Sequence, residues 1–344
     1  MIHYSQYDKD PGIYPTSSFI ASLLGANKIL IAGHSDPDGD ALGSATALAL
    51  ALRDRGKEVK VGHIGRITPN LFFLMDPKEL FFELPYNGSY LGEIDLLVFV
   101  DCHGPERVWQ DLGHQEFLAL PPFLVIDHHQ YDGKIDGPID IFHDPIASST
   151  GELICRLLKA GDFTFTAPIV RALLTAIVSD TNFFTQTNAT ASALKEAGDL
   201  VALGGNLEDI NVRLNYSWSI GRMRLLSQSL NSLELYCNGQ LATMLLTAEM
   251  LRAADATLED ADGFVDYPRG IEGVLLAVFF KEVGRGKVKV SMRSRHPVSA
   301  REIAQAFGGG GHVMASAYTE LTPFAQEAKE RFLNGICRFF EVAK

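Results

Sequence analysis

Cysteine is scarce in this chain of 344 residues, and its four cysteines show no paired spacing. A disulfide framework or a zinc knuckle needs cysteines at regular, closely paired positions, so the sequence fits reduced thiols better than either. Reduced thiols are typical of the cytoplasm, which is therefore the predicted location. A secretory signal is also missing, because residues 1–14 contain acidic side chains and a proline but no apolar core.

Long hydrophobic runs and a basic surplus are absent as well. The apolar stretch 41–52 is too short to span a bilayer, so no membrane partner is expected. Thirty lysines and arginines face 42 aspartates and glutamates, a formal net charge of −12. Proteins that wrap long nucleic acid usually present a basic face, because phosphate contacts dominate that affinity. The net charge therefore disfavours long duplex nucleic acid as a partner. Small phosphorylated ligands remain compatible with it, because bound cations would reverse the charge locally.

What the sequence does contain is an alternation of apolar strands and helices. Residues 28–33, 58–63, 94–100 and 123–126 are predicted strands, and 41–55 is a predicted helix. This alternation predicts an α/β fold with a parallel sheet covered on both faces. Ligands of such sheets bind beyond the carboxyl ends of the strands. Polar clusters follow three of the strands directly, which is the first indication of a functional site.

The pattern changes in the second half of the chain. Helical spacing over 169–178 and 191–203 completes the first domain, and a pair of glycines ends the second of these helices. Shorter strands and helices then indicate a second, smaller α/β domain. We predict a first domain over 1–205, a helical linker over 206–228 and a second domain over 229–344. The active site is expected in the cleft between the domains.

The loop after the first strand alternates potential ligands. A calcium loop of the EF-hand type would need a glycine after the third acidic position and a glutamate at the twelfth. Ala41 and Ala47 occupy those positions, so that type of calcium site is excluded. A solvated acidic turn is the remaining alternative to a metal site. The potential ligands are His34, Asp36, Asp38 and Asp40.

A second polar cluster, Asp127-His128-His129, follows the strand 123–126. Adjacent histidines point in different directions, so one can bind a metal while the other faces a substrate. Asp101 and Asp180 are single carboxylates at the ends of apolar elements, where each alone could be a cap. Crowded together, however, carboxylates repel one another unless cations neutralise them. An oxygen-rich set with two histidines suits manganese or magnesium better than structural zinc.

The order of these motifs resembles that of the DHH phosphoesterase superfamily. His34-x-x-x-Asp38-x-Asp40, Asp101, Asp127-His128-His129 and Asp180 match the four motifs of that family in sequence. The run Gly308-Gly309-Gly310-Gly311-His312 resembles the glycine-rich motif of the DHHA1 subfamily. The first domain would then be the DHH metal-binding catalytic domain and the second the DHHA1 substrate-binding domain.

Within the superfamily, the chain is most similar to the compact branch of oligoribonucleases and 3′-phosphoadenosine 5′-phosphate phosphatases, the nanoRNases. The resemblance implies metal-dependent hydrolysis of phosphate esters in short RNA or in that mononucleotide. A phosphodiesterase for linear or cyclic signalling dinucleotides is the alternative enzyme. A nucleotide-sensing module that does not cleave is disfavoured, because no ligand of the family pattern is missing.

The resemblance also implies a role for each residue of the first domain. Two divalent ions are expected, manganese first, with magnesium or cobalt as alternatives. His34 and Asp38 would bind one ion, and Asp101 would bridge to the other. Asp101 and His129 would be the catalytic residues, with His129 on the substrate phosphate, and Asp127 would orient a histidine. The second ion would be held by Asp40, His128 and Asp180.

The second domain carries the predicted substrate-binding residues. Glycines let a backbone approach a ligand closely and present amide donors to phosphate, although a mobile turn between two helices is the alternative. Arginine suits bidentate phosphate binding, and a surface charge is the alternative for Arg295. A homodimer is left open. The predicted set is Arg293, Arg295, Gly309, Gly310, Gly311 and His312.

Overall fold

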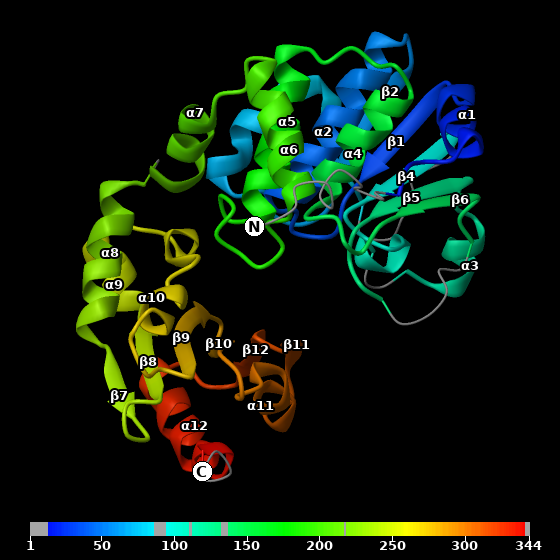
Figure 1. Cartoon of the computed structure of the whole chain (residues 1–344). Coiled ribbons are helices and arrows are strands. Elements are labelled where there is room, and N and C mark those ends of the chain that lie inside the picture. Colours follow the sequence, from blue (N-terminus) through cyan, green and yellow to red (C-terminus); the bar gives the residue numbers. More distant parts are fainter. Residues whose placement is uncertain (1–12, 86–93, 110–111, 132–136, 217, 341–344) are drawn as a thin grey trace, which may run out of the picture. The chain divides into compact units, whose positions relative to one another are not determined.

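The computed structural model describes residues 13–85, 94–109, 112–131, 137–216 and 218–340, without the side chains of 312 and 337–340 (Figure 1). The chain divides into two units between residues 217 and 218, inside the predicted linker. The domain limits 1–205, 206–228 and 229–344 themselves stay predictions. No helix in the described part of the chain is long and apolar enough to cross a membrane.

The first unit is built on a six-stranded parallel sheet, as the sequence predicts. The strand order is β3-β2-β1-β4-β5-β6, so the chain runs outward from the central pair β1 and β4 in both directions. β3 and β6 were not predicted, because they are short and only partly apolar. The strands are β1 (Lys28–Ala32), β2 (Glu58–His63), β3 (Phe81–Glu83), β4 (Leu96–Val100), β5 (Phe123–Asp127) and β6 (Asp140–His143).

Side chains of the strands alternate between two cores, one on each face of the sheet. Ile29 and Ile31 of β1 join the core that contains α2 (Gly39–Asp54), whereas Leu30 and Ala32 join the opposite core. Both faces of the central strands are thus buried, which explains their continuous apolar runs. Other elements are α1 (Ser17–Gly25), η2 (Pro69–Leu74), η3 (Lys78–Leu80), η4 (Pro105–Arg107), α3 (His114–Leu118), α4 (Thr150–Ala160), α5 (Ala167–Asp180) and α6 (Ala191–Ala202).

The start of α4 is a partial capping box. The sequence Ser149-x-x-Glu152 predicts reciprocal side-chain bonds at a helix start. Ser149 Oγ does accept a hydrogen bond from the backbone N–H of Glu152, 3.2 Å away. The Glu152 carboxylate, however, accepts from the N–H of Ser148, one residue before the cap. These two hydrogen bonds connect the end of the loop 144–149 to the first turn of α4.

The second unit contains a mixed six-stranded sheet of order β11-β12-β10-β9-β8-β7, in which only the pair β8 and β9 is parallel. The predicted helical connector is also present, as α7 (Leu207–Asn211), the π-helical turn η5 (Val212–Tyr216) and α8 (Ile220–Asn231). The strands are β7 (Glu234–Tyr236), β8 (Leu241–Leu246), β9 (Leu276–Gly284), β10 (Lys287–Ser294), β11 (Gly310–His312) and β12 (Ala315–Glu320).

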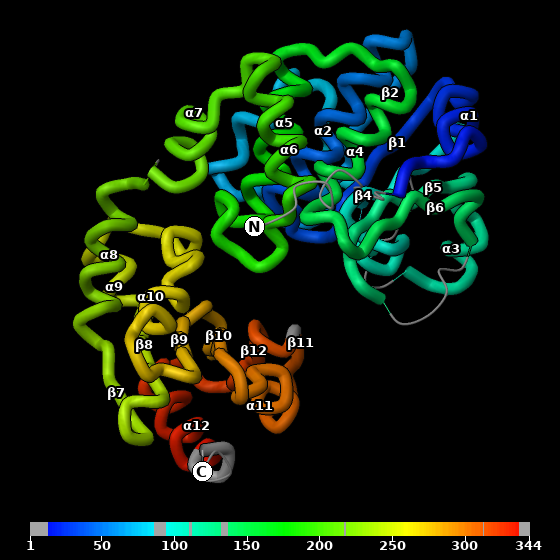
Figure 2. The backbone as a smooth tube through the Cα atoms, in the orientation of Figure 1, coloured from blue at the N-terminus to red at the C-terminus, as the bar shows by residue number. Residues whose placement is uncertain are grey.

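Helices cover both faces of this second sheet, and the tube in Figure 2 shows the path between them. Val288 and Val290 of β10 pack in one core with α11 (Ala300–Ala306) and α12 (Ala325–Phe340). Phe279 of β9 lies in the opposite core, with α8 and α9 (Ala248–Ala254). The remaining elements are η6 (Leu258–Ala261) and α10 (Asp266–Arg269).

The glycine run has a structural explanation that the sequence did not indicate. It does not turn between two helices; it leads from α11 into the edge strand β11, which pairs with β12. A Cβ at Gly309 would lie 2.2 Å from the carbonyl oxygen of Ala317, and Gly311 has a φ of +140°. Both positions therefore require glycine for the sheet itself.

Candidate metal centre

The predicted ligands meet at the carboxyl edge of the first sheet, at the point where the strand order reverses. His34 follows β1 and Asp101 follows β4, and these two strands are neighbours. The loop after β1 is tethered on both sides, because Ser35 N–H donates to the carbonyl of Arg107 and Asp36 N–H to that of Ile64. A crevice at such a switch point is the usual ligand site of an open parallel sheet.

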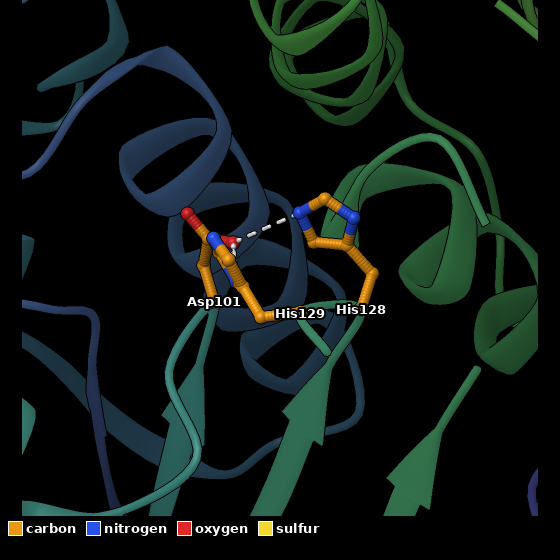
Figure 3. A group of neighbouring side chains, drawn as sticks. All are labelled: Asp101, His128 and His129. Carbon is orange, nitrogen blue, oxygen red and sulfur yellow. Dashed lines mark ion pairs between the residues drawn. The ribbon is translucent and has the colours of Figure 1, made fainter. Parts of the chain in front are cut away.

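Asp101 lies at the centre of the cluster. Its two carboxylate oxygens lie 3.5 Å from three imidazole nitrogens: His34 Nε2, His128 Nε2 and His129 Nδ1. Figure 3 shows both histidine rings of the β5 loop beside this carboxylate. The backbone of Asp101 has a left-handed φ of 58°, a conformation that non-glycine residues rarely adopt. The chain thus turns sharply as β4 ends, at the residue predicted to bridge two ions.

Two groups of possible ligands flank Asp101. His34, Asp38 and Asp101 offer ligand atoms within 4.8 Å of one another, and so do Asp40, His128 and Asp180. These are the two sets that the family resemblance implies. A third group of this kind, Asp101, His128 and His129, overlaps both. The structure therefore brings together all six predicted metal ligands, with Asp101 in contact with histidines of both sets.

Asp38 and Asp40 are held by helix N-termini. Asp38 is the N-cap of α2, and its Oδ1 accepts the N–H groups of Asp40 and Ala41. Asp40 is buried, and its two oxygens accept the N–H groups of Thr150 and Gly151 at 2.7 and 2.8 Å. Those amides open α4, and the positive end of a helix stabilises a carboxylate. Asp40 Oδ2 still faces His128 Nε2, 3.8 Å away.

Close packing of α2 against α5 brings Asp40 towards Asp180. A Cβ on Gly39 would lie 2.2 Å from Ser179 Oγ, so no larger residue fits between the helices there. Asp180 is the last residue of α5, and its Oδ2 lies 3.7 Å from His128 Nε2. A carboxylate at the negative end of a helix is electrostatically unfavourable, which suits a position that a cation would neutralise.

Two residues that hold the ligands were not predicted. Thr150 Oγ1 donates to Asp101 Oδ1 at 3.1 Å, although the sequence indicated only its place in a capping motif. Asn188 Nδ2 donates to the carbonyls of Ser148 and Asp180 and to Asp180 Oδ2, at 3.0, 3.2 and 3.1 Å. Asn188 lies in a polar stretch with no periodic pattern, so nothing local marked it.

Crowding shifts the proton affinities of the carboxylates apart. Burial, together with the charge of Asp101, raises the pKa of Asp40 well above its ordinary value. For Asp180, burial and the same neighbouring charge outweigh His128 and raise the pKa to about 6. Burial would also raise the pKa of Asp101, but the imidazoles of His128 and His34, 3.5 Å from its oxygens, outweigh burial and lower that pKa. Asp101 is therefore the carboxylate that stays ionised most readily.

The same carboxylates raise the pKa of the two histidines that face them. Burial lowers the pKa of His34, but the Asp101 carboxylate 3.5 Å away and the charge of Asp38 outweigh burial and raise that pKa to about 9. For His128, burial is likewise overcome by Asp101 and Asp40, and the pKa rises to about 10. In both cases the surrounding carboxylates stabilise a positive charge in this position.

The donor set fits divalent cations. His128 Nε2 is buried and has no hydrogen-bond partner among the described residues, although carboxylate oxygens of Asp40, Asp101 and Asp180 lie 3.5–3.8 Å away. Its other nitrogen, Nδ1, lies 3.3 Å from the carbonyl of Ala147. A metal-ligating histidine usually donates its other ring N–H to a carbonyl or carboxylate, and His128 has this arrangement through Nδ1 and Ala147.

His129 is held by its neighbour in the sequence. Its Nδ1 lies 2.9 Å from Asp127 Oδ1, which also accepts the backbone N–H of His129. The hydrogen bond to Asp127 is the largest effect on His129 and raises its pKa. The half-exposed imidazole is thus directed and biased towards the charged form, in which it can donate to an anion. Asp127 contacts His129 rather than the buried His128.

The predicted residues of the second unit lie on β10 and at β11. Arg293 belongs to β10, and its Nε lies 3.6 Å from Asp266 Oδ1. Arg295 is exposed just beyond that strand. The backbone of His312 ends β11, but its side chain lies outside the described part of the structure. Asp36, a potential ligand by its place in the loop, belongs to neither ligand group, and its Oδ1 accepts the N–H of Arg66.

A parallel sheet with a carboxylate–histidine centre at its switch point, joined to a smaller mixed-sheet unit, defines a class of two-domain α/β proteins with a candidate metal centre. The chain belongs to the DHH family. The family model of the DHH N-terminal domain matches residues 28–179, and that of the DHHA1 domain matches residues 241–341. The family predicted from the motifs is therefore confirmed.

Individual relatives agree with this membership. The chain is 32% identical to the bifunctional oligoribonuclease and PAP phosphatase NrnA of Thermus thermophilus, over 95% of each chain. It is 27% identical to the cyclic-di-AMP phosphodiesterase GdpP of Geobacillus thermodenitrificans, over 93% of this chain but only 48% of that protein. A solved structure, the exopolyphosphatase-related protein from Bacteroides fragilis, matches with a TM-score of 0.83 and 25% identity, over 94% of this chain and 96% of that one.

Proposed function

We propose that this chain is a metal-dependent hydrolase that cleaves phosphoester bonds in short oligoribonucleotides and in 3′-phosphoadenosine 5′-phosphate. The observation that carries the proposal is the pair of ligand groups, His34–Asp38–Asp101 and Asp40–His128–Asp180, with Asp101 between them. Such a pair has the composition and closeness expected of a two-metal phosphoesterase site. The Thermus relative, named for both activities, matches over 95% of its length, which supports the substrate class.

Bound divalent cations would neutralise charge that develops on the phosphoryl oxygens and would help to orient the scissile bond. Manganese is the proposed ion, because carboxylates and two imidazoles suit it. His129 is proposed to donate a hydrogen bond to a phosphoryl oxygen, held in direction by Asp127. Asp101 would contribute its carboxylate to both ions, since its oxygens lie 3.5 Å from His34 Nε2 of one ligand group and His128 Nε2 of the other.

The second unit is proposed to bind the part of the substrate that does not react. Arg293, Arg295, Gly309, Gly310, Gly311 and His312 are the residues proposed for this. A cytoplasmic location is part of the proposal, and the oligomeric state, including a homodimer, is open to measurement. Hydrolysis of signalling dinucleotides is the alternative, supported by relatives such as GdpP, of which this chain matches only about half.

The test is a substrate panel with the purified full chain and MnCl₂. The panel contains 3′-phosphoadenosine 5′-phosphate, a linear diadenylate, cyclic di-AMP and RNA of about two to twenty nucleotides, with products separated by chromatography. Release of phosphate from the mononucleotide and of mononucleotides from short RNA is expected. Cleavage of cyclic di-AMP alone would favour the alternative, and no cleavage in any arm with metal bound would contradict hydrolysis itself.

A further inference from the structure

Three aromatic side chains lie at the carboxyl edge of the first sheet beyond the metal ligands. His103 comes two residues after Asp101, and Tyr131 two residues after His129. The third, His143, ends β6, the next strand along the sheet. β4, β5 and β6 are adjacent, so the three rings follow neighbouring strands in the order of the sheet. None of the three takes part in the metal centre described above.

The three rings contact one another in a row. The centroid of Tyr131 lies 5.6 Å from that of His103 and 4.6 Å from that of His143, with interplanar angles of 34° and 44°. All three residues are partly exposed, so the row is not sealed inside the core. Burial and the charge of Asp127 raise the pKa of Tyr131, which keeps its ring a neutral phenol.

Hydrogen bonds join this row to the metal centre and to a carboxylate. His143 Nε2 lies 2.8 Å from the backbone carbonyl of His129, so the row begins directly beside the residue proposed to contact the phosphate. At the other end, His103 Nε2 lies 3.2 Å from Glu106 Oε1. The Glu106 side chain is 59% exposed, and a carboxylate there can accept a hydrogen bond from the amino group of a base.

We propose that the row His103–Tyr131–His143 is a nucleobase subsite of the first domain, on which the base next to the attacked phosphate stacks. The inference rests on the proposed function and extends it by assigning a site for the base. Aromatic faces are the general means of holding unpaired bases, and such stacking tolerates every base because each has a π-face. A tolerant subsite suits an enzyme that degrades short RNA of mixed sequence.

The experiment measures binding, so it does not depend on turnover. The probe is 2-aminopurine riboside 5′-monophosphate, a fluorescent nucleotide with the single phosphate of a product, titrated with the full chain in the presence of MnCl₂. Ribose 5-phosphate, which lacks a base, is measured in parallel by calorimetry. The variants are Tyr131→Leu, His103→Leu and Tyr131→Phe, and Tyr216→Leu is the control, because it removes a strongly exposed tyrosine of the connector.

Loss of stacking on one ring should raise the Kd for the nucleotide about ten-fold in Tyr131→Leu. A smaller rise is expected in His103→Leu. The Kd for ribose 5-phosphate should change less than about two-fold, and Tyr131→Phe should keep both affinities because the ring remains. Fluorescence quenching by the wild type, the sign of a stacked base, should be lost in Tyr131→Leu only. Circular dichroism and manganese content should match the wild type in every variant.

Unchanged nucleotide affinity in Tyr131→Leu, or an equal loss for ribose 5-phosphate, would overturn the subsite. So would a wild type that does not quench the probe. A failure of the proposed function would look different. If the wild type binds the nucleotide and quenches its fluorescence but cleaves no phosphoester, the hydrolase activity is contradicted and the nucleobase subsite is not. Conversely, if both leucine variants cleave the substrate and bind the nucleotide as the wild type does, the nucleobase subsite is contradicted and the hydrolase activity is not.

Discussion

The side-chain amide of Asn188 donates a hydrogen bond to the carboxylate of Asp180, with Nδ2 and Oδ2 3.1 Å apart. The same nitrogen lies 3.0 Å from the carbonyl of Ser148, so Asn188 ties the end of α5 to the loop before α4. Asp180 Oδ2 also faces His128. Asn188 therefore fixes the direction of one proposed ligand from outside the ligand set.

Asn188→Ala should weaken manganese binding by about 10–100-fold, the usual effect of removing a partner that orients a ligand. Calorimetric titration of the metal-free protein measures this without reference to activity. Gln186→Ala is the matched control, because Gln186 is exposed in the same loop. Equal affinities of the two variants would remove the positioning role. Excess manganese should restore much of the turnover of Asn188→Ala.

Asp101→Ala should lose at least about 100-fold in kcat, because the loss of a residue that only orients a ligand already costs about 10–100-fold. It should also bind fewer manganese ions per chain, since Asp101 is proposed to bridge them. Steady-state kinetics and elemental analysis provide the two readouts, and circular dichroism checks the fold. Near-normal activity in manganese would contradict the two-metal assignment.

Turnover should fall sharply as the RNA grows beyond a few nucleotides. Tracking along longer single strands normally needs a basic groove with stacking aromatics, whereas this chain has a net charge of −12. Rates on RNA of two, three, five and about twenty nucleotides, compared at equal concentrations, test this prediction. Equal rates at both ends of the series would refute it.

Arg293→Ala and His312→Ala should raise KM and spare kcat, while both ions stay bound. A charge-assisted contact contributes about 1.5–3 kcal/mol, and if it is equal in ground and transition states its loss affects binding alone. A minimal phosphodiester without nucleotide features should be cleaved equally by variants and wild type. Metal content and steady-state kinetics on both substrates test this prediction. Loss of metal, or an equal loss of activity on both substrates, would contradict a role in substrate binding alone.

Acid should remove the stabilising effect of one buried ion pair. Arg156 Nη1 donates to Asp144 Oδ2 at 2.7 Å, and the two side chains are 4% and 5% exposed. Burial raises the pKa of Asp144, but the bond with Arg156 outweighs it and lowers that pKa. A carboxylate with a lowered folded-state pKa stabilises the fold above its unfolded pKa of about 4, and this contribution is lost as pH falls through the folded value.

Asp144→Asn should therefore lower the free energy of unfolding by about 1.5–3 kcal/mol at pH 7, because Arg156 loses one of its two buried carboxylate partners and keeps only Glu152. The difference from wild type should shrink steadily between pH 5 and pH 3. Urea unfolding at pH 7, 5, 4 and 3 measures it, with the exposed Asp54→Asn as control. A difference of the same size at pH 7 and pH 3 would show that the Asp144 charge is not responsible.

Local pattern sufficed for much of the fold and for the chemistry of the centre. The apolar runs of β1, β4 and β5 predicted a parallel sheet, because strands buried on both faces need continuous apolar side chains. The six ligand types and their order along the chain indicated the family. The places of His34, Asp101 and His128 after three of the strands also predicted that these residues would meet, since parallel strands bring their carboxyl ends to one edge.

The tertiary structure alone decided how those ligands are held. The hydrogen bonds of Asp40 at the start of α4, the hydrogen bond from Asn188 to Asp180 and the row of rings beside His129 join residues from 8 to 110 positions apart. No periodic pattern encodes such pairs, because they depend on which strands become neighbours. The short strands β3 and β6 were missed for the same reason: they exist through pairing with β2 and β5, not through their own propensity.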